Sequence, residues 1–295
     1  MTLKSILVVM QGGPGDQTRL AEAFAIAKPH DASVAALHVK PTPAIYVGSP
    51  GVEIPAAIID AQIQEIDSTA NAIEGAVKAQ AAKAGVAIEW RCEEGDEVST
   101  AGVHARYSDL VVASPDLARD LVFVSAAPVL AFPDAAKPGV PKRLLVAWNG
   151  SREAARAVWD AAPLMGMVKN VDVLVVDPPG ERPIGQDLGR ALARHGINVD
   201  VRERLSNGAD IGGILLEEAR TSGADLLVMG AYGHSRFREW DLGFAQRLFG
   251  RAAEHPFAEA RMAVGAHHQQ VGADRLAFRH LAAGDGNQDV LDGHG

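Results

Sequence analysis

The residues with the clearest chemical potential are three glycines in the second half of the chain. Gly230 and Gly233 follow the apolar run Asp225-Leu-Leu-Val-Met229, and Gly243 comes later, where a helix is expected to begin. Glycine lets the backbone approach a ligand closely and adopt positive φ. The N–H groups of such a loop, together with a helix N-terminus, attract anions such as phosphate. The pattern is neither the GxGxxG nor the P-loop signature, so it predicts either an anion-binding loop or a plain tight turn.

Composition excludes several classes of protein. The chain has 295 residues and a net charge of −9, which argues against nonspecific binding of nucleic acid. Its one cysteine, Cys92, permits no intrachain disulfide and no cysteine-based zinc cluster. No signal-peptide pattern is visible, and no apolar run approaches the roughly 20 residues of a membrane helix. We therefore expect a cytoplasmic protein without nucleic-acid or membrane partners.

The chain repeats one pattern of strands and helices. Residues 4–10 and residues 142–148 are both apolar strand patterns, and each leads through a glycine-containing turn into an alanine-rich helical stretch. A later strand ends at Ser114 in the first copy and at Gly230 in the second. The first copy is longer and contains a predicted helix at about residues 53–82. Strands that alternate with helices indicate a parallel sheet with both faces covered, whose ligands lie at the carboxyl ends of the strands.

We predict an α/β protein with two tandem, open, parallel five-stranded sheets that carry helices on both faces. The predicted parts are a first domain (1–133), a linker rich in proline (134–141), a second domain (142–265) and a flexible tail (266–295). The first copy ends in the strand pattern Ala127-Pro-Val-Leu-Ala-Phe132, whereas the second offers only a weak apolar run at residues 261–264. The second copy is therefore expected to end atypically, and a frame-shifted end after about residue 240 would explain the change.

Taken together, these features resemble the universal stress protein family in its tandem two-domain form. The resemblance rests on Val146-Ala-Trp-Asn-Gly-Ser151, on Gly223-Ala-Asp-Leu-Leu-Val-Met-Gly230 and on the loop Gly230-Ala-Tyr-Gly-His-Ser-Arg236. The family's Gly-x2-Gly-x9-Gly spacing is met by Gly230, Gly233 and Gly243. It covers roughly residues 3–133 and 141–243. The resemblance implies an adenine nucleotide alpha hydrolase-like fold, and ATP, with or without Mg²⁺, as the ligand of those members that keep the site.

Carried over by position, the resemblance places a nucleotide site in the second domain. It implies adenosine contacts from Asn149 and Val176, ribose and phosphate contacts from Met229, Gly230 and Gly233, flanking positions for His234 and Arg236, and a phosphate contact from Gly243.

Three residues depart from the family pattern. Asn149 stands where ATP-binding members usually have Asp, Phe244 replaces the Ser or Thr that would bind phosphate, and Asp241 adds a negative charge. One lost hydrogen bond costs about 1 kcal/mol, or roughly five- to tenfold in affinity. The first copy has no glycine between Ser114 and Val124. We therefore expect weak ATP binding in the second domain and none in the first.

We expect a non-catalytic regulatory protein of the stress response, with at most slow ATP hydrolysis, no catalytic residues and no metal site. Two alternatives stay open. One is an enzyme for adenylyl or phosphoryl transfer, which needs a metal or a basic set around the phosphates, for which the loop offers only Arg236 and Arg238. The other is a module that binds an unknown protein partner and has lost the nucleotide.

The final strand pattern of the first copy, residues 128–132, would be an apolar edge open to association. We expect it to be covered by residues 261–264 or by a second chain in a homodimer.

Overall fold

The computed structural model describes residues 2–43, 55–180, 182–230 and 261–265. The first half of the chain forms β1 (Ser5–Val9), α1 (Asp16–His30), β2 (Ser33–Lys40), α2 (Ala56–Ala84), β3 (Ile88–Glu94), α3 (Glu97–Ala105), β4 (Leu110–Ala113), α4 (Pro115–Leu121) and β5 (Val129–Ala131). The second half forms β6 (Arg143–Ala147), α5 (Arg152–Met165), β7 (Asn170–Val176), α6 (Ile184–Ala193), β8 (Val199–Arg204), α7 (Ile211–Ser222), β9 (Leu226–Gly230) and β10 (Arg261–Gly265).

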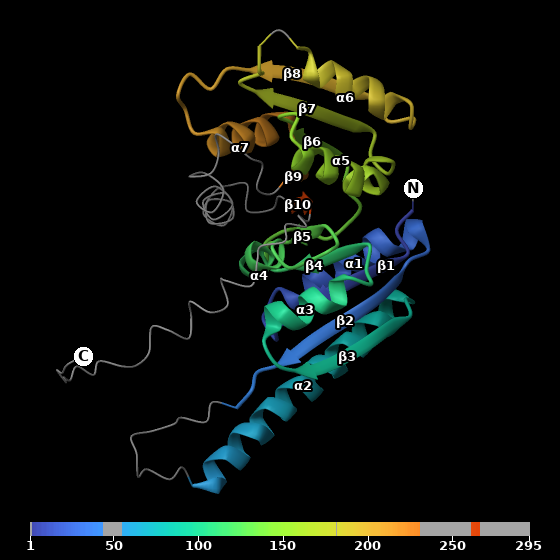
Figure 1. The fold of residues 1–295 in the computed structure, drawn as a ribbon. Helices are drawn as coiled ribbons and strands as arrows, with labels where there is room; N and C mark the ends of the chain where they lie inside the picture. The colour runs from blue at the N-terminus through green and yellow to red at the C-terminus, as the bar shows by residue number, and fades with distance from the viewer. Residues whose placement is uncertain (1, 44–54, 181, 231–260, 266–295) are drawn as a thin grey trace, which may run out of the picture.

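The two halves have the same topology, as the sequence predicts. The ten strands lie in the order β3-β2-β1-β4-β5-β10-β9-β6-β7-β8 (Figure 1). Within each half all neighbours are parallel, with β1 between β2 and β4 and β6 between β7 and β9. The strand order therefore reverses at β1 and at β6, and a crevice for ligands is expected at the carboxyl ends of these strands.

The two predicted sheets are joined into one by β10. This strand pairs in parallel with β9, where Ala263 lies opposite Val228, and antiparallel with β5, where Ala263 lies opposite Leu130. The expectation that residues 261–264 cover the final strand of the first half is confirmed. The sequence pattern underestimates β10 because the strand is held by pairing with strands on both sides. It occupies in the second half the place that β5 has in the first.

Helices cover both faces of the sheet, as predicted. One apolar layer lies between the sheet and α1, α2, α5 and α6, and the other lies beneath α3, α4 and α7. The central strands read as continuous apolar runs because both of their faces are buried. Among the described helices, none combines the length and the apolar character that crossing a membrane requires.

Two buried charged residues of α1 hold the segment that connects the two halves against the first half. Arg19 is 2% exposed, and its guanidinium lies 2.5 Å from the Asp134 carboxylate and 2.7 Å from that of Asp16. The backbone N–H of Gly139 donates to the Glu22 carboxylate at 2.8 Å. The connecting segment is thus held against the first half by ionic and hydrogen-bonded contacts.

Candidate functional site

The carboxyl edge of β6, β7 and β9 brings four of the predicted site residues together. Ala147 lies opposite Leu174 in the β6–β7 pairing, so Asn149 and Val176 follow at the same level two residues further on. Met229 and Gly230 close β9 on the other side of β6. The other predicted site residues lie outside the described part of the chain, namely Gly233, His234, Arg236 and Gly243.

Val176 and Met229 lie at the ends of β7 and β9, with β6 between them. Both pack into the apolar layer beneath α7, together with Ala147 and Ile211. Met229 is 9% exposed, and Val176 is half-buried at the end of its strand. Asn149 is exposed on the turn that leaves β6.

Asn149 has a structural role of its own. Its side-chain oxygen accepts a hydrogen bond from the backbone N–H of Ser151 at 3.0 Å, which shapes the turn around Gly150 (φ 75°). The Ser151 hydroxyl in turn accepts from the N–H of Ala154 at 3.1 Å and caps α5. An aspartate would make the same turn, so asparagine at this position provides the same local structure without a negative charge.

Gly230 has a packing reason that involves no ligand. A Cβ built at this position would lie 2.5 Å from the backbone nitrogen of Ala154 and 2.5 Å from the carbonyl carbon of Glu153. The first turn of α5 therefore approaches the end of β9 too closely for any side chain. The alternative that this glycine belongs to a tight structural junction is well supported at position 230.

One carboxylate at this edge stays ionised. Hydrogen bonds from the hydroxyl and the backbone N–H of Ser206 lower the pKa of the exposed Asp177. The N–H bond is 2.8 Å long and ties the turn after β7 to the turn after β8. A negative charge at the end of β7 does not favour an anionic ligand on that side of the edge.

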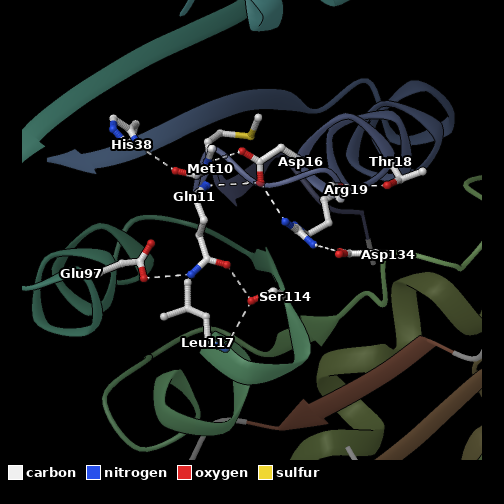
Figure 2. Close-up of polar contacts among 12 residues, drawn as sticks. Met10, Gln11, Asp16, Thr18, Arg19, His38, Glu97, Ser114, Leu117 and Asp134 are labelled. Carbon is white, nitrogen blue, oxygen red and sulfur yellow. Dashed lines mark hydrogen bonds and ion pairs between the residues drawn. The ribbon is translucent and has the colours of Figure 1, made fainter. Parts of the chain in front are cut away.

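At the corresponding edge of the first half, side chains join the turn after β1 to α3 and α4 (Figure 2), and a cavity of about 710 Å³ lies beside them, lined by Gln11, His38 and Glu97 among others. Ser114 caps α4, and Pro115 takes the first helical position, so β4 leads directly into the helix. The Ser114 hydroxyl donates to Gln11 at 2.7 Å, and the Gln11 amide donates to Glu97 at 2.9 Å. These hydrogen bonds join the end of β1, the start of α3 and the start of α4.

The glycine-rich turn after β1 is also occupied from within. The Asp16 carboxylate accepts hydrogen bonds from the N–H groups of Gln11 and Gly12, at 3.2 and 2.7 Å, and it is ion-paired with Arg19. Asp16 is only 5% exposed. A phosphate at this turn would have to replace a buried, paired carboxylate. Neither feature was predicted from the sequence, although the Ser-Pro start of α4 is a known helix-start signal.

The carboxyl group of Glu97 should make the free energy of unfolding depend on pH. Burial raises the pKa of this carboxyl, although the hydrogen bond from Gln11 opposes the shift. The folded state therefore binds the proton more tightly than the unfolded state, and stability is lost as the pH rises through the folded pKa. We expect Glu97→Gln, which keeps an acceptor for Gln11, to raise the free energy of unfolding at pH 7. Urea titrations should show this gain disappearing below about pH 4, where Glu97 is protonated in both states. An equal gain at pH 3.5 and pH 7 would contradict this explanation.

Comparison with known proteins bears on the fold. No protein-family model matches the sequence, and no curated protein matches it. A universal stress protein from Archaeoglobus fulgidus DSM 4304 is similar in structure, with a TM-score of 0.65 and 16% identity over 90% of this chain and 97% of that chain. A putative universal stress protein from Pseudomonas aeruginosa UCBPP-PA14 has a TM-score of 0.50 and 16% identity over 89% of this chain and 92% of that chain. The resemblance seen in the sequence is thus confirmed in the fold, over both halves.

Proposed function

We propose that this chain, which has the fold of universal stress proteins in both halves, is a stress-response regulatory protein that binds an adenine nucleotide in its second half. The observation that carries the proposal is the carboxyl edge of β6, β7 and β9. There Asn149, Val176 and Met229 meet at the point where the strand order reverses. Val176, which is half-buried at the end of β7, offers an apolar surface to a purine, and Asn149 offers polar groups at its rim.

The two halves differ in a way that supports binding in the second one alone. In the first half Ser114, Gln11 and Glu97 are bonded to one another, and the Asp16 carboxylate takes the N–H groups of the turn. In the second half β9 ends in Gly230, after which the sequence continues with Gly233 and Gly243. These glycines are the proposed contacts to the phosphates of ATP, with or without Mg²⁺. Asp241 and Phe244 make the expected affinity weak.

A matched pair of substitutions tests the location of the site. Asn149→Leu and Gln11→Leu change equivalent positions in the two halves by the same side chain. We expect Asn149→Leu to weaken ATP binding about tenfold, because it removes the polar rim and one hydrogen-bonding group. Gln11→Leu should leave the affinity unchanged. Titration calorimetry with ATP and Mg²⁺ measures both, and circular dichroism verifies the fold of each variant.

The same titrations separate the alternatives. Equal loss in both variants, or loss in Gln11→Leu alone, would contradict the assignment to the second half. Purified wild-type protein that neither retains nor binds an adenine nucleotide would favour a module for a protein partner. Incubation with ATP and Mg²⁺ should yield no product beyond slow hydrolysis. Rapid formation of an adenylylated or phosphorylated product would favour the enzyme.

A further inference from the structure

The helix α2 is longer than the sheet that it covers. Its 29 residues span about 43 Å at 1.5 Å per residue, whereas the eight residues of β2 span about 26 Å. The buried residues of α2 begin only at Ala70. Residues 56–69, named here the α2 overhang, run past the carboxyl ends of β2 and β3 (Figure 1).

The α2 overhang is apolar and acidic. Ile58 and Ile63 are 52% and 41% exposed, which is unusual for such large aliphatic side chains. The overhang contains the acids Asp60, Glu65 and Asp67 and no lysine or arginine. Asp67 is paired with Lys40, at 3.1 Å, within the same chain. Within the described residues, Asp60 and Glu65 have no ion-pair partner.

A groove of the opposite character lies between α1 and α2. It has a volume of about 670 Å³ and is floored by alanines and Phe24, with Ala76 and Ala79 on the α2 side. Two lysines, Lys28 and Lys83, line it, and no acidic residue does. In the part of the chain that the structure describes, neither lysine has an ion-pair partner. The groove is therefore apolar and basic, whereas the α2 overhang is apolar and acidic.

We propose that two copies of this chain pair about a two-fold axis, with the α2 overhang of each seated in the groove between α1 and α2 of the other. The two α2 helices then run antiparallel. Lys83, in the last turn of α2, comes opposite Glu65 in the first half of the partner's α2. At about 100° per residue, Ile58 and Glu65 lie on the helix face that Ala76 and Lys83 share, so Ile58 covers the alanine floor, whereas Asp60 and Ile63 point to other faces. The contact is isologous, because each copy supplies one overhang and one groove.

The middle of α2 is suited to the crossing of the two helices. Ala72 and Gly75 are both exposed there. A Cβ at Gly75 would meet no described atom within 4 Å, so packing within the chain gives no reason for glycine. Glycine in a helix interior costs about 1 kcal/mol relative to alanine. Small residues at this point let two helix backbones approach closely.

Charge reversal in the full chain tests the proposal. Sedimentation velocity at low ionic strength should show a dimer for the wild type. The acid-reversed variant, Glu65→Lys, and the base-reversed variant, Lys28→Glu with Lys83→Glu, should each raise the dimer dissociation constant at least tenfold. An equimolar mixture of the two should dimerise again, since each overhang then faces a groove of opposite charge. Added salt should weaken both pairings.

Two further variants separate this surface from others. Ala79→Trp fills the groove without changing a charge and should also give monomers. Asp116→Lys, whose side chain is 92% exposed on α4, is the control and should leave the dimer intact. Circular dichroism verifies that every variant is folded. A monomeric wild type, a dimer that survives both reversals and Ala79→Trp, or a mixture that stays monomeric would overturn the proposal.

Discussion

A chain that ends after residue 260 should lose much of its stability, whereas a chain that ends after residue 265 should keep it. The two truncations differ only in β10, the strand that lies between β5 and β9. Without it the two halves would face each other across two strand spacings of about 4.8 Å each. Both the antiparallel ladder to β5 and the parallel ladder to β9 would be lost.

The expected loss is large because a central strand is removed. Loss of more than about 4 kcal/mol corresponds to a fall in the melting midpoint of roughly 10 °C or more. The exposed strands Val129–Ala131 and Leu226–Gly230 are almost wholly apolar, so the shorter chain should also associate through these edges. Calorimetry and light scattering on the two truncations measure both effects. Equal melting midpoints would show that β10 does not hold the halves together.

Much of the fold could be predicted because its determinants are local. Buried parallel strands read as apolar runs, and helices follow them with alanine-rich patterns, so Ser5–Val9 and Arg143–Ala147 were evident as the first strands of two copies. The strand Arg261–Gly265 was harder to predict. Its five residues are stabilised by pairing with strands distant in sequence, and such contacts leave a weak local pattern.

The candidate site, like the fold, could be predicted only where its determinants are local in the sequence. The strand ends that carry Asn149, Val176 and Met229 follow from the βαβ pattern and its known place for ligands. The side-chain contacts that join the turn after β1 to α3 and α4 in the first half do not follow from this pattern, because they join residues far apart in the chain. Ser114 and Gln11 are 103 positions apart, and Gln11 and Glu97 are 86 apart. The sequence predicts the absence of a glycine loop there, and only the structure shows which contacts form at this edge.

Gly230→Ala should destabilise the protein by about 2 kcal/mol, the cost of overfilling a closely packed site. The added Cβ meets the backbone of Glu153 and Ala154, and neither can yield unless the first turn of α5 shifts. Gly75→Ala is the matched control, since within one chain the same methyl group meets no described atom within 4 Å and, at concentrations where the protein is monomeric, should stabilise α2 by up to about 1 kcal/mol. Urea titrations of both variants without nucleotide should therefore give changes of opposite sign.

The same experiment decides what Gly230 is for. If this glycine serves only a ligand, Gly230→Ala leaves the stability of the nucleotide-free protein unchanged and lowers only the affinity for ATP. If this glycine is required for the packing of β9 against α5, Gly230→Ala lowers the stability of the nucleotide-free protein. Affinity then falls as a consequence, because the turn from Asn149 to the cap of α5 at Ser151 shifts together with the helix. A Cβ at position 230 would lie only 2.5 Å from two backbone atoms of α5, which favours the second result. Unchanged stability with reduced ATP affinity would assign Gly230 to the ligand instead.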